Sequence, residues 1–103
     1  MDNFEKLRIF YDHEKLWLEN LQIRWEDEYN YEDPEDYKKV IIEKAKNYDL
    51  TVKKVKLSYR DLSIKITFQF PNQIGHIDIL KTRNKVYLNN VLKWYEITCK
   101  EVK

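Results

Sequence analysis

The sequence predicts a single α+β domain, residues 1–103, in which an antiparallel β-meander of three or more strands carries two or three helices on one face. Two patterns carry this prediction. Residues 34–47 repeat apolar side chains with the period of a helix, whereas residues from 50 onward alternate apolar and polar side chains as strands do. A length of 103 residues with 43% hydrophobic content indicates one globular domain with its own core.

Residues 3–30 fit either one long helix or two strands. Residues 7–11 and 21–25 alternate as strands would, with residues 12–14 as a turn between them. A helical stripe at three- and four-residue spacing, interrupted by Glu14, is formed by Phe4, Leu7, Tyr11, Leu18, Leu21 and Trp25. No Gly or Pro breaks the segment and helix-forming residues are frequent, so we expect a helix.

The clearest helix signal covers residues 34–47. Asp33 is a suitable N-cap, Pro34 suits the first helical position, and Lys44 and Lys46 complement the helix dipole near the end. The predicted apolar stripe consists of Tyr37, Val40, Ile41, Ala45 and Tyr48.

Residues 54–60 and 63–70 predict two half-buried strands, because apolar and polar residues alternate strictly in both. The short link at residues 60–62 makes them an antiparallel hairpin. Residues 71–73 predict the next turn. Residues 74–81 predict a third strand that places Ile77 and Ile79 on one side.

Residues 84–103 are again open to two interpretations. A helical stripe would be formed by Leu88, Val91, Leu92, Tyr95, Cys99 and Val102. Residues 85–88 and 94–102 would equally form strands. Residues 15–21 (KLWLENL) resemble residues 85–91 (KVYLNNV), and shared ancestry would require one conformation for both. We interpret this similarity as a coincidence in a chain of biased composition.

Charge is unevenly distributed along the chain. Residues 1–37 carry twelve acids and four bases, a net charge of −8, whereas residues 38–103 carry fifteen bases and six acids, a net charge of +9. The acidic-aromatic segment, residues 25–37, holds seven carboxylates, four aromatic residues and no Lys or Arg. This pattern predicts a dipolar molecule with one acidic end.

Several classes of activity are disfavoured by what the sequence lacks. Cys99 is the only cysteine, so neither a disulfide nor a cysteine-based zinc site is expected, and Gly75 alone makes no phosphate-binding loop. His76 and Asp78 lie two apart on a predicted strand, which is half of a general-base arrangement, but no nucleophile motif accompanies them. The acids lack the spacing of a calcium loop. We therefore expect no enzymatic activity, no metal and no cofactor.

Carboxylates interleaved with aromatic residues suit a surface that docks on a basic groove of another protein, such as a nucleic-acid channel. We therefore expect a small intracellular, cytoplasmic protein that inhibits a nucleic-acid-handling protein as a decoy, in the manner of phage or plasmid anti-defence proteins. The N-terminus resembles neither a signal peptide nor a membrane span. The expected partner-binding residues are Trp25, Glu26, Asp27, Glu28, Tyr29, Tyr31, Glu32, Asp33 and Asp36.

Three other interpretations remain open. An immunity or antitoxin-type protein would use the same acidic surface on a different protein partner. The opposite hypothesis is a nucleic-acid-binding module that uses the basic hairpin, residues 53–65, with Tyr59 among its lysines. The third is a purely solvated acidic face without a partner. A monomer or a small homo-oligomer is compatible with each.

Overall fold

The computed structural model describes residues 2–26, 34–58, 63–79, 86–88, 91–93 and 95–102, with side chains for 2–18, 37–57, 63–79 and 95–102. Two helices, α1 (Asn3–Glu26) and α2 (Pro34–Lys46), precede all the described strands. The strands are β1 (Thr51–Ser58), β2 (Ser63–Gln69), β3 (Gln73–Ile79), β4 (Val86–Leu88), β5 (Val91–Lys93) and β6 (Tyr95–Glu101).

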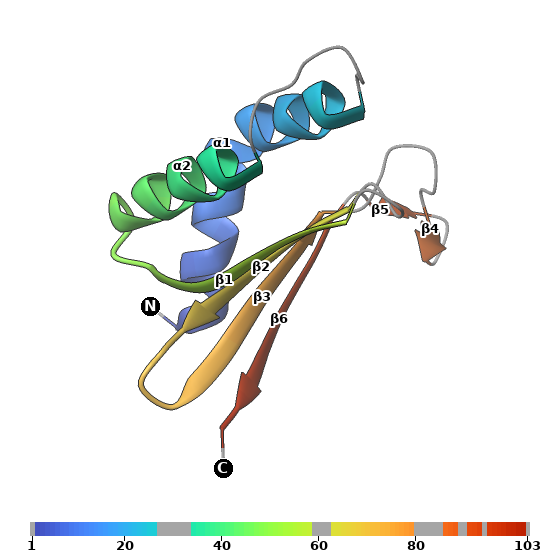
Figure 1. The fold of residues 1–103 in the computed structure, drawn as a ribbon. Helices are drawn as coiled ribbons and strands as arrows, with labels where there is room; N and C mark the ends of the chain where they lie inside the picture. Colours follow the sequence, from blue (N-terminus) through green and yellow to red (C-terminus); the bar gives the residue numbers. More distant parts are fainter. Residues whose placement is uncertain are drawn as a thin grey trace.

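Strands β1, β2, β3 and β6 form one antiparallel sheet in that order, and β4 pairs with β5 in a separate hairpin. Helix α2 packs against β1, and α1 packs against β3 and β6. Figure 1 shows both helices on the same side of the four-stranded sheet. The predicted fold class, an antiparallel meander with helices on one face, is therefore confirmed.

The inner face of the sheet, which meets the helices, is formed by the apolar residues of each strand. Register aligns Val55, Ile66, Ile77 and Ile97 in one row across the sheet, and the first three are buried. A register shift between Val52 and Lys54 inserts one extra residue into β1. This bulge brings Val52 to the core as well, although it lies three positions, an odd number, from Val55.

Helix α1 confirms the helical interpretation of the N-terminal segment, and the two-strand alternative is wrong. Asp2 caps the helix, because its carboxylate accepts a hydrogen bond of 2.7 Å from the backbone N–H of Glu5. Among the side chains of α1 that the structure describes, Leu7, Phe10, Tyr11 and Leu18 are buried. Phe4, predicted to lie in the core, is 44% exposed, because it sits in the first turn at the edge of the contact with the sheet, whereas Phe10 is fully buried.

Helix α2 confirms the second predicted helix, and it ends in a Schellman motif. The N–H of Leu50 donates to the carbonyl of Ala45 at 3.0 Å, and the N–H of Asp49 donates to that of Lys46 at 3.1 Å. Asp49 occupies the left-handed position of this motif with φ of 61°. One member of the predicted apolar stripe, Val40, is 40% exposed, since it turns away from the sheet beside the buried Ile41.

Gly75 is the only glycine, and its position is explained by packing. A Cβ atom there would lie 2.7 Å from Cδ1 of Leu7 in α1 and 3.0 Å from Cε2 of Phe70. Glycine therefore allows α1 to approach the backbone of β3 closely.

The C-terminal region consists of strands where the structure describes it, so the helical stripe across residues 88–102 is wrong. Tyr95, Ile97 and Cys99 pack against the core from β6. Residues 15–21 are helical whereas 86–88 form a strand, so the two similar segments adopt different conformations, as expected of a coincidence. Within the described ranges, no helix has the length and apolar character needed to cross a membrane.

Candidate functional site

The two helices meet at a polar junction formed by Glu14, Lys44 and Tyr48. One carboxylate oxygen of Glu14, Oε2, lies 3.2 Å from Nζ of Lys44, and the other, Oε1, accepts a hydrogen bond of 2.9 Å from the phenol of Tyr48. Glu14 is only 17% exposed, so this ion pair is better shielded from solvent than the helix-surface pairs Arg8–Glu5 and Lys46–Glu43. Glu14 is thereby joined to two residues that lie 30 and 34 positions further along the chain.

Aromatic side chains surround the junction. The ammonium of Lys44 lies 4.9 Å from the ring centroid of Trp17, which adds a cation–π contact to the ion pair. The ring of Tyr48 packs edge-on against Phe10, with centroids 5.3 Å apart. Burial, then the hydrogen bond to Glu14 and its negative charge, raises the pKa of Tyr48, so the phenol stays a neutral donor. The junction therefore serves to hold the two helices together.

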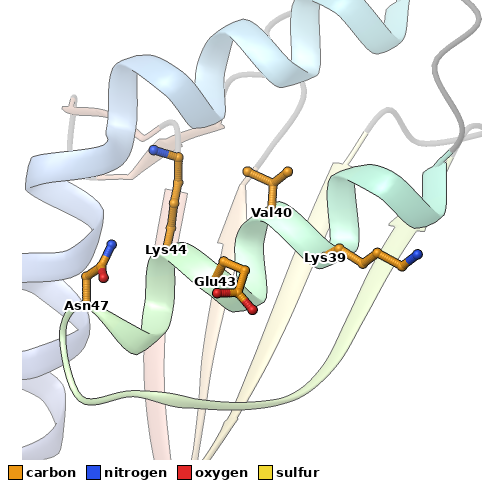
Figure 2. A pocket seen from close by; sticks show the side chains of 5 residues that line it. All are labelled: Lys39, Val40, Glu43, Lys44 and Asn47. Atoms are coloured by element: carbon orange, nitrogen blue, oxygen red, sulfur yellow. The ribbon is translucent and has the colours of Figure 1, made fainter.

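An open hollow of ≈ 420 Å³ lies along α2 and shares Lys44 with the junction. Figure 2 shows its lining side chains, Lys39, Val40, Glu43, Lys44 and Asn47, spaced along one side of the helix, with Lys44 reaching toward α1. Lys44 is paired with Glu14, and Glu43 lies 3.2 Å from Lys46. These described lining residues include neither a histidine nor a hydroxyl or thiol nucleophile, so they form no recognisable catalytic set.

The outer face of the sheet, which points away from the helices, carries polar and charged residues in two rows. Register aligns Lys54, Thr67, His76 and Thr98 in one row and Lys56, Lys65, Asp78 and Glu96 in the next. The β1–β2 side of this face is therefore basic, with three exposed lysines, and the β3–β6 side carries the two acids together with the exposed Lys100. Lys56 and Lys65 lie directly opposite each other, an arrangement that costs stability because like charges repel.

His76 and Asp78 lie on this outer face together, as their spacing predicted. The imidazole Nδ1 of His76 is hydrogen-bonded to the hydroxyl of Thr67 at 3.1 Å. Partial burial, followed by the positive charges of Lys65 and Lys100, lowers the pKa of His76 despite the opposing effect of Asp78. Its ring is thus tied to a threonine of the neighbouring strand.

All nine predicted partner-binding residues lie outside the described side chains. Trp25 and Glu26 fall in the last turn of α1 and Asp36 in the first turn of α2, where only the backbone is described. The other six, Asp27, Glu28, Tyr29, Tyr31, Glu32 and Asp33, lie outside the described residues, as does the predicted N-cap role of Asp33. Tyr37, counted among the aromatics of the acidic-aromatic segment, is 6% exposed and belongs to the core.

The basic hairpin of the alternative hypothesis is described in part. Lys53, Lys54, Lys56 and Lys65 are exposed, and the last three share the outer face. Tyr59 and Arg60, the other members of that predicted surface, lie outside the described residues.

The described part of the chain offers little support for a metal site or a reactive thiol. No three His, Cys, Asp or Glu side chains there lie close enough together to hold a metal ion. Cys99 is half-buried on the inner face, and burial followed by the charge of Asp2 raises its pKa, which disfavours the reactive thiolate.

The junction of Glu14, Lys44 and Tyr48 was not predicted from the sequence. One signal pointed to it, because Glu14 interrupts the apolar stripe of α1, and a charged residue inside such a stripe needs a partner when it is buried. Its partners come from another helix and the turn that follows it, so sequence spacing could not identify them.

Together these features define a small α+β protein with a two-helix layer on one face of its sheet and a charged outer face on the other. Comparison of the chain with protein families, with curated proteins and with solved structures gave no match.

Proposed function

We propose that this chain is a non-enzymatic binding protein that inhibits a nucleic-acid-handling protein, using the acidic-aromatic segment as its docking surface. The observation that carries the proposal is the position of the segment between the two helices. Residues 25 and 26 close α1, and Pro34 opens α2, so the segment joins two helices that lie on the inner side of the sheet. The partner would be a protein with a basic groove that otherwise holds DNA or RNA.

The acids at the end of α1 do not serve the helix itself. The C-terminal end of a helix carries partial negative charge, so Glu26 in the last turn, with Asp27 and Glu28 next in sequence, is unfavourable there. Residues that work against local stability are better explained by an interaction with a partner. The helix dipole adds to the negative potential that would steer a basic partner toward this end.

Six of the described basic residues support a separation of charge across the molecule, whereas Lys38 and Lys39 of α2 directly follow the segment. Lys54, Lys56 and Lys65 project from the outer face of the sheet, on the opposite side from the helices. On the helical side, Arg8, Lys44 and Lys46 are paired with Glu5, Glu14 and Glu43, none of which belongs to the acidic-aromatic segment. Each of these six cations thus lies on the opposite side of the sheet or is paired with an acid outside the acidic-aromatic segment.

Charge reversal tests the proposal. Glu26→Lys combined with Glu28→Lys should weaken partner binding about tenfold or more, because each close charge pair that is lost costs over a kcal/mol. The partner is first captured from a bacterial lysate at low salt and eluted at high salt, and its affinity for each variant is then measured by calorimetry.

The matched control is Asp12→Lys combined with Glu43→Lys, which makes the same change in net charge at two exposed helical positions outside the segment. The control should retain the affinity of the unmodified protein. Equal affinity for all three proteins would overturn the docking surface. Capture of a toxin-like enzyme that does not bind nucleic acid would support the immunity-type alternative.

A second candidate function is direct nucleic-acid binding by the outer face, and the facing pair Lys56 and Lys65 favours it. Their mutual repulsion would be relieved by a phosphate between them. Lys56→Glu combined with Lys65→Glu should then abolish retention of labelled DNA or RNA, whereas Lys39→Glu combined with Lys46→Glu on α2 should not. Absence of retention by the unmodified protein at low salt would remove this candidate.

A further inference from the structure

The four-stranded sheet has two edges, β1 and β6, and they differ in how they are protected. An edge strand presents unpaired backbone groups to which another strand can add. In the described part of the chain, no strand pairs with the outer edge of β1 or with that of β6.

The edge at β1 is protected against such addition. Its ladder is interrupted by the bulge between Val52 and Lys54, and the exposed Lys53, Lys54 and Lys56 follow along the strand. Bulges and lysines are the features by which natural edge strands avoid pairing with other chains.

The edge at β6 has no bulge and carries a single exposed lysine, Lys100. All seven residues from Tyr95 to Glu101 are paired with β3 without a register shift, so the strand is regular over its whole length. Tyr95, Ile97 and Cys99 are half-buried apolar side chains on the inner face, which leaves apolar surface at the edge. This edge is therefore competent to accept a further strand.

The charges of β6 have poor partners within the chain. Glu96 lies directly opposite Asp78 of β3, so two carboxylates face each other. Lys100 lies opposite Ile74, which offers no charge. Both residues are exposed on the outer face.

We propose that a second copy of this chain pairs with the protein through β6, antiparallel, around a two-fold axis at Thr98. Thr98 is the central residue of β6, so this register pairs all seven residues. It places Glu96 opposite Lys100 of the second copy, and Lys100 opposite its Glu96. Each carboxylate that faces Asp78 in its own chain thus gains a lysine on its other side.

The same register also matches the apolar residues. Ile97 lies opposite Cys99 of the second copy on the inner face, so the half-buried surface at each edge is covered. Centring the axis on Ile97 or on Cys99 instead would leave Glu96 and Lys100 unmatched and would pair fewer residues. The dimer would have one continuous sheet of eight strands with all four helices on the same side.

Charge reversal at β6 tests the interface by sedimentation equilibrium. Glu96→Lys and Lys100→Glu, each made alone, should raise the dimer dissociation constant about tenfold, because each change disrupts two symmetry-related pairs. The double variant with both changes should dimerise as the unmodified protein does. Glu96→Lys also removes the repulsion from Asp78, so the monomer itself should not be destabilised by this change.

Cysteine trapping tests the register. Thr98→Cys in a Cys99→Ser background should give a disulfide-linked dimer on mild oxidation, because the two introduced thiols face each other across the axis. Lys100→Cys in the same background is the control, since its thiol would face Glu96 and should not cross-link. A monomeric unmodified protein, or equal cross-linking of both variants, would overturn the proposal. So would a dimer whose dissociation constant the charge reversals leave unchanged.

Discussion

The two faces of the sheet are built from the same strands and carry opposite kinds of residue. In β2, Ile64, Ile66 and Phe68 are fully buried on the inner face, whereas Lys65 and Thr67 point outward. The inner face is constrained by packing against the helices, and the outer face is not. The difference teaches that the fold is specified by one face, so unfavourable charge placements on the other, such as Lys56 opposite Lys65, call for an explanation outside the fold.

The largest expected contrast between the faces is at neighbouring residues of β2. Phe68→Ala should lower the free energy of unfolding by about 3–5 kcal/mol, since it opens a cavity beneath the ring of Phe10, whose centroid lies 5.8 Å away. Thr67→Ala should cost about 1 kcal/mol, the value of its hydrogen bond to His76. Urea unfolding of both variants measures the contrast, and similar losses would contradict the assignment of the faces.

A smaller effect is expected where α1 meets the inner face. Gly75→Ala should lower the free energy of unfolding by about 1–3 kcal/mol, because the new methyl group overlaps Leu7 and Phe70. Combining it with Leu7→Ala should cost less than the sum of the two single changes, since the truncated residue vacates the space. Additive losses would show that the close approach of α1 does not limit residue 75.

The smallest expected effect is the pH dependence due to His76 on the outer face. Its pKa is lowered in the folded protein from the ordinary 6.5, so the unfolded chain takes up the proton first as the pH falls. Stability should therefore decline below pH 6.5 and level off once the pH passes the folded-state pKa. His76→Gln should remove this component in urea titrations, whereas His13→Gln at an exposed position should retain it.

Much of the fold could be predicted because hydrophobic period determines which face of an element is buried. The helix at α2 and the hairpin of β1 and β2 were predicted from such periods. Residues 84–103 could not be assigned, since a helical stripe and strand alternation fitted equally, and only the pairing of β6 with β3 decides between them. The exposure of Phe4 and Val40 depends on where each helix meets the sheet. The hydrophobic period of the sequence does not define that position.

The candidate sites were less accessible to prediction. Composition identified the acidic-aromatic segment, but its function as a docking surface stays a prediction. The two facing carboxylates of β3 and β6 were not predicted from the sequence. Glu96 and Asp78 are distant in sequence, and they face each other only because β3 and β6 adjoin in the sheet.

Gly75 fills a packing role, whereas the left-handed turn after α2 is formed by Asp49. Most residues other than glycine are strained in that conformation, and aspartate is tolerated there better than most. Replacing Asp49 with glycine, which is not strained in this conformation, would therefore raise the thermal stability of the chain. Such a gain would leave the acidic-aromatic segment and the β6 edge unaltered.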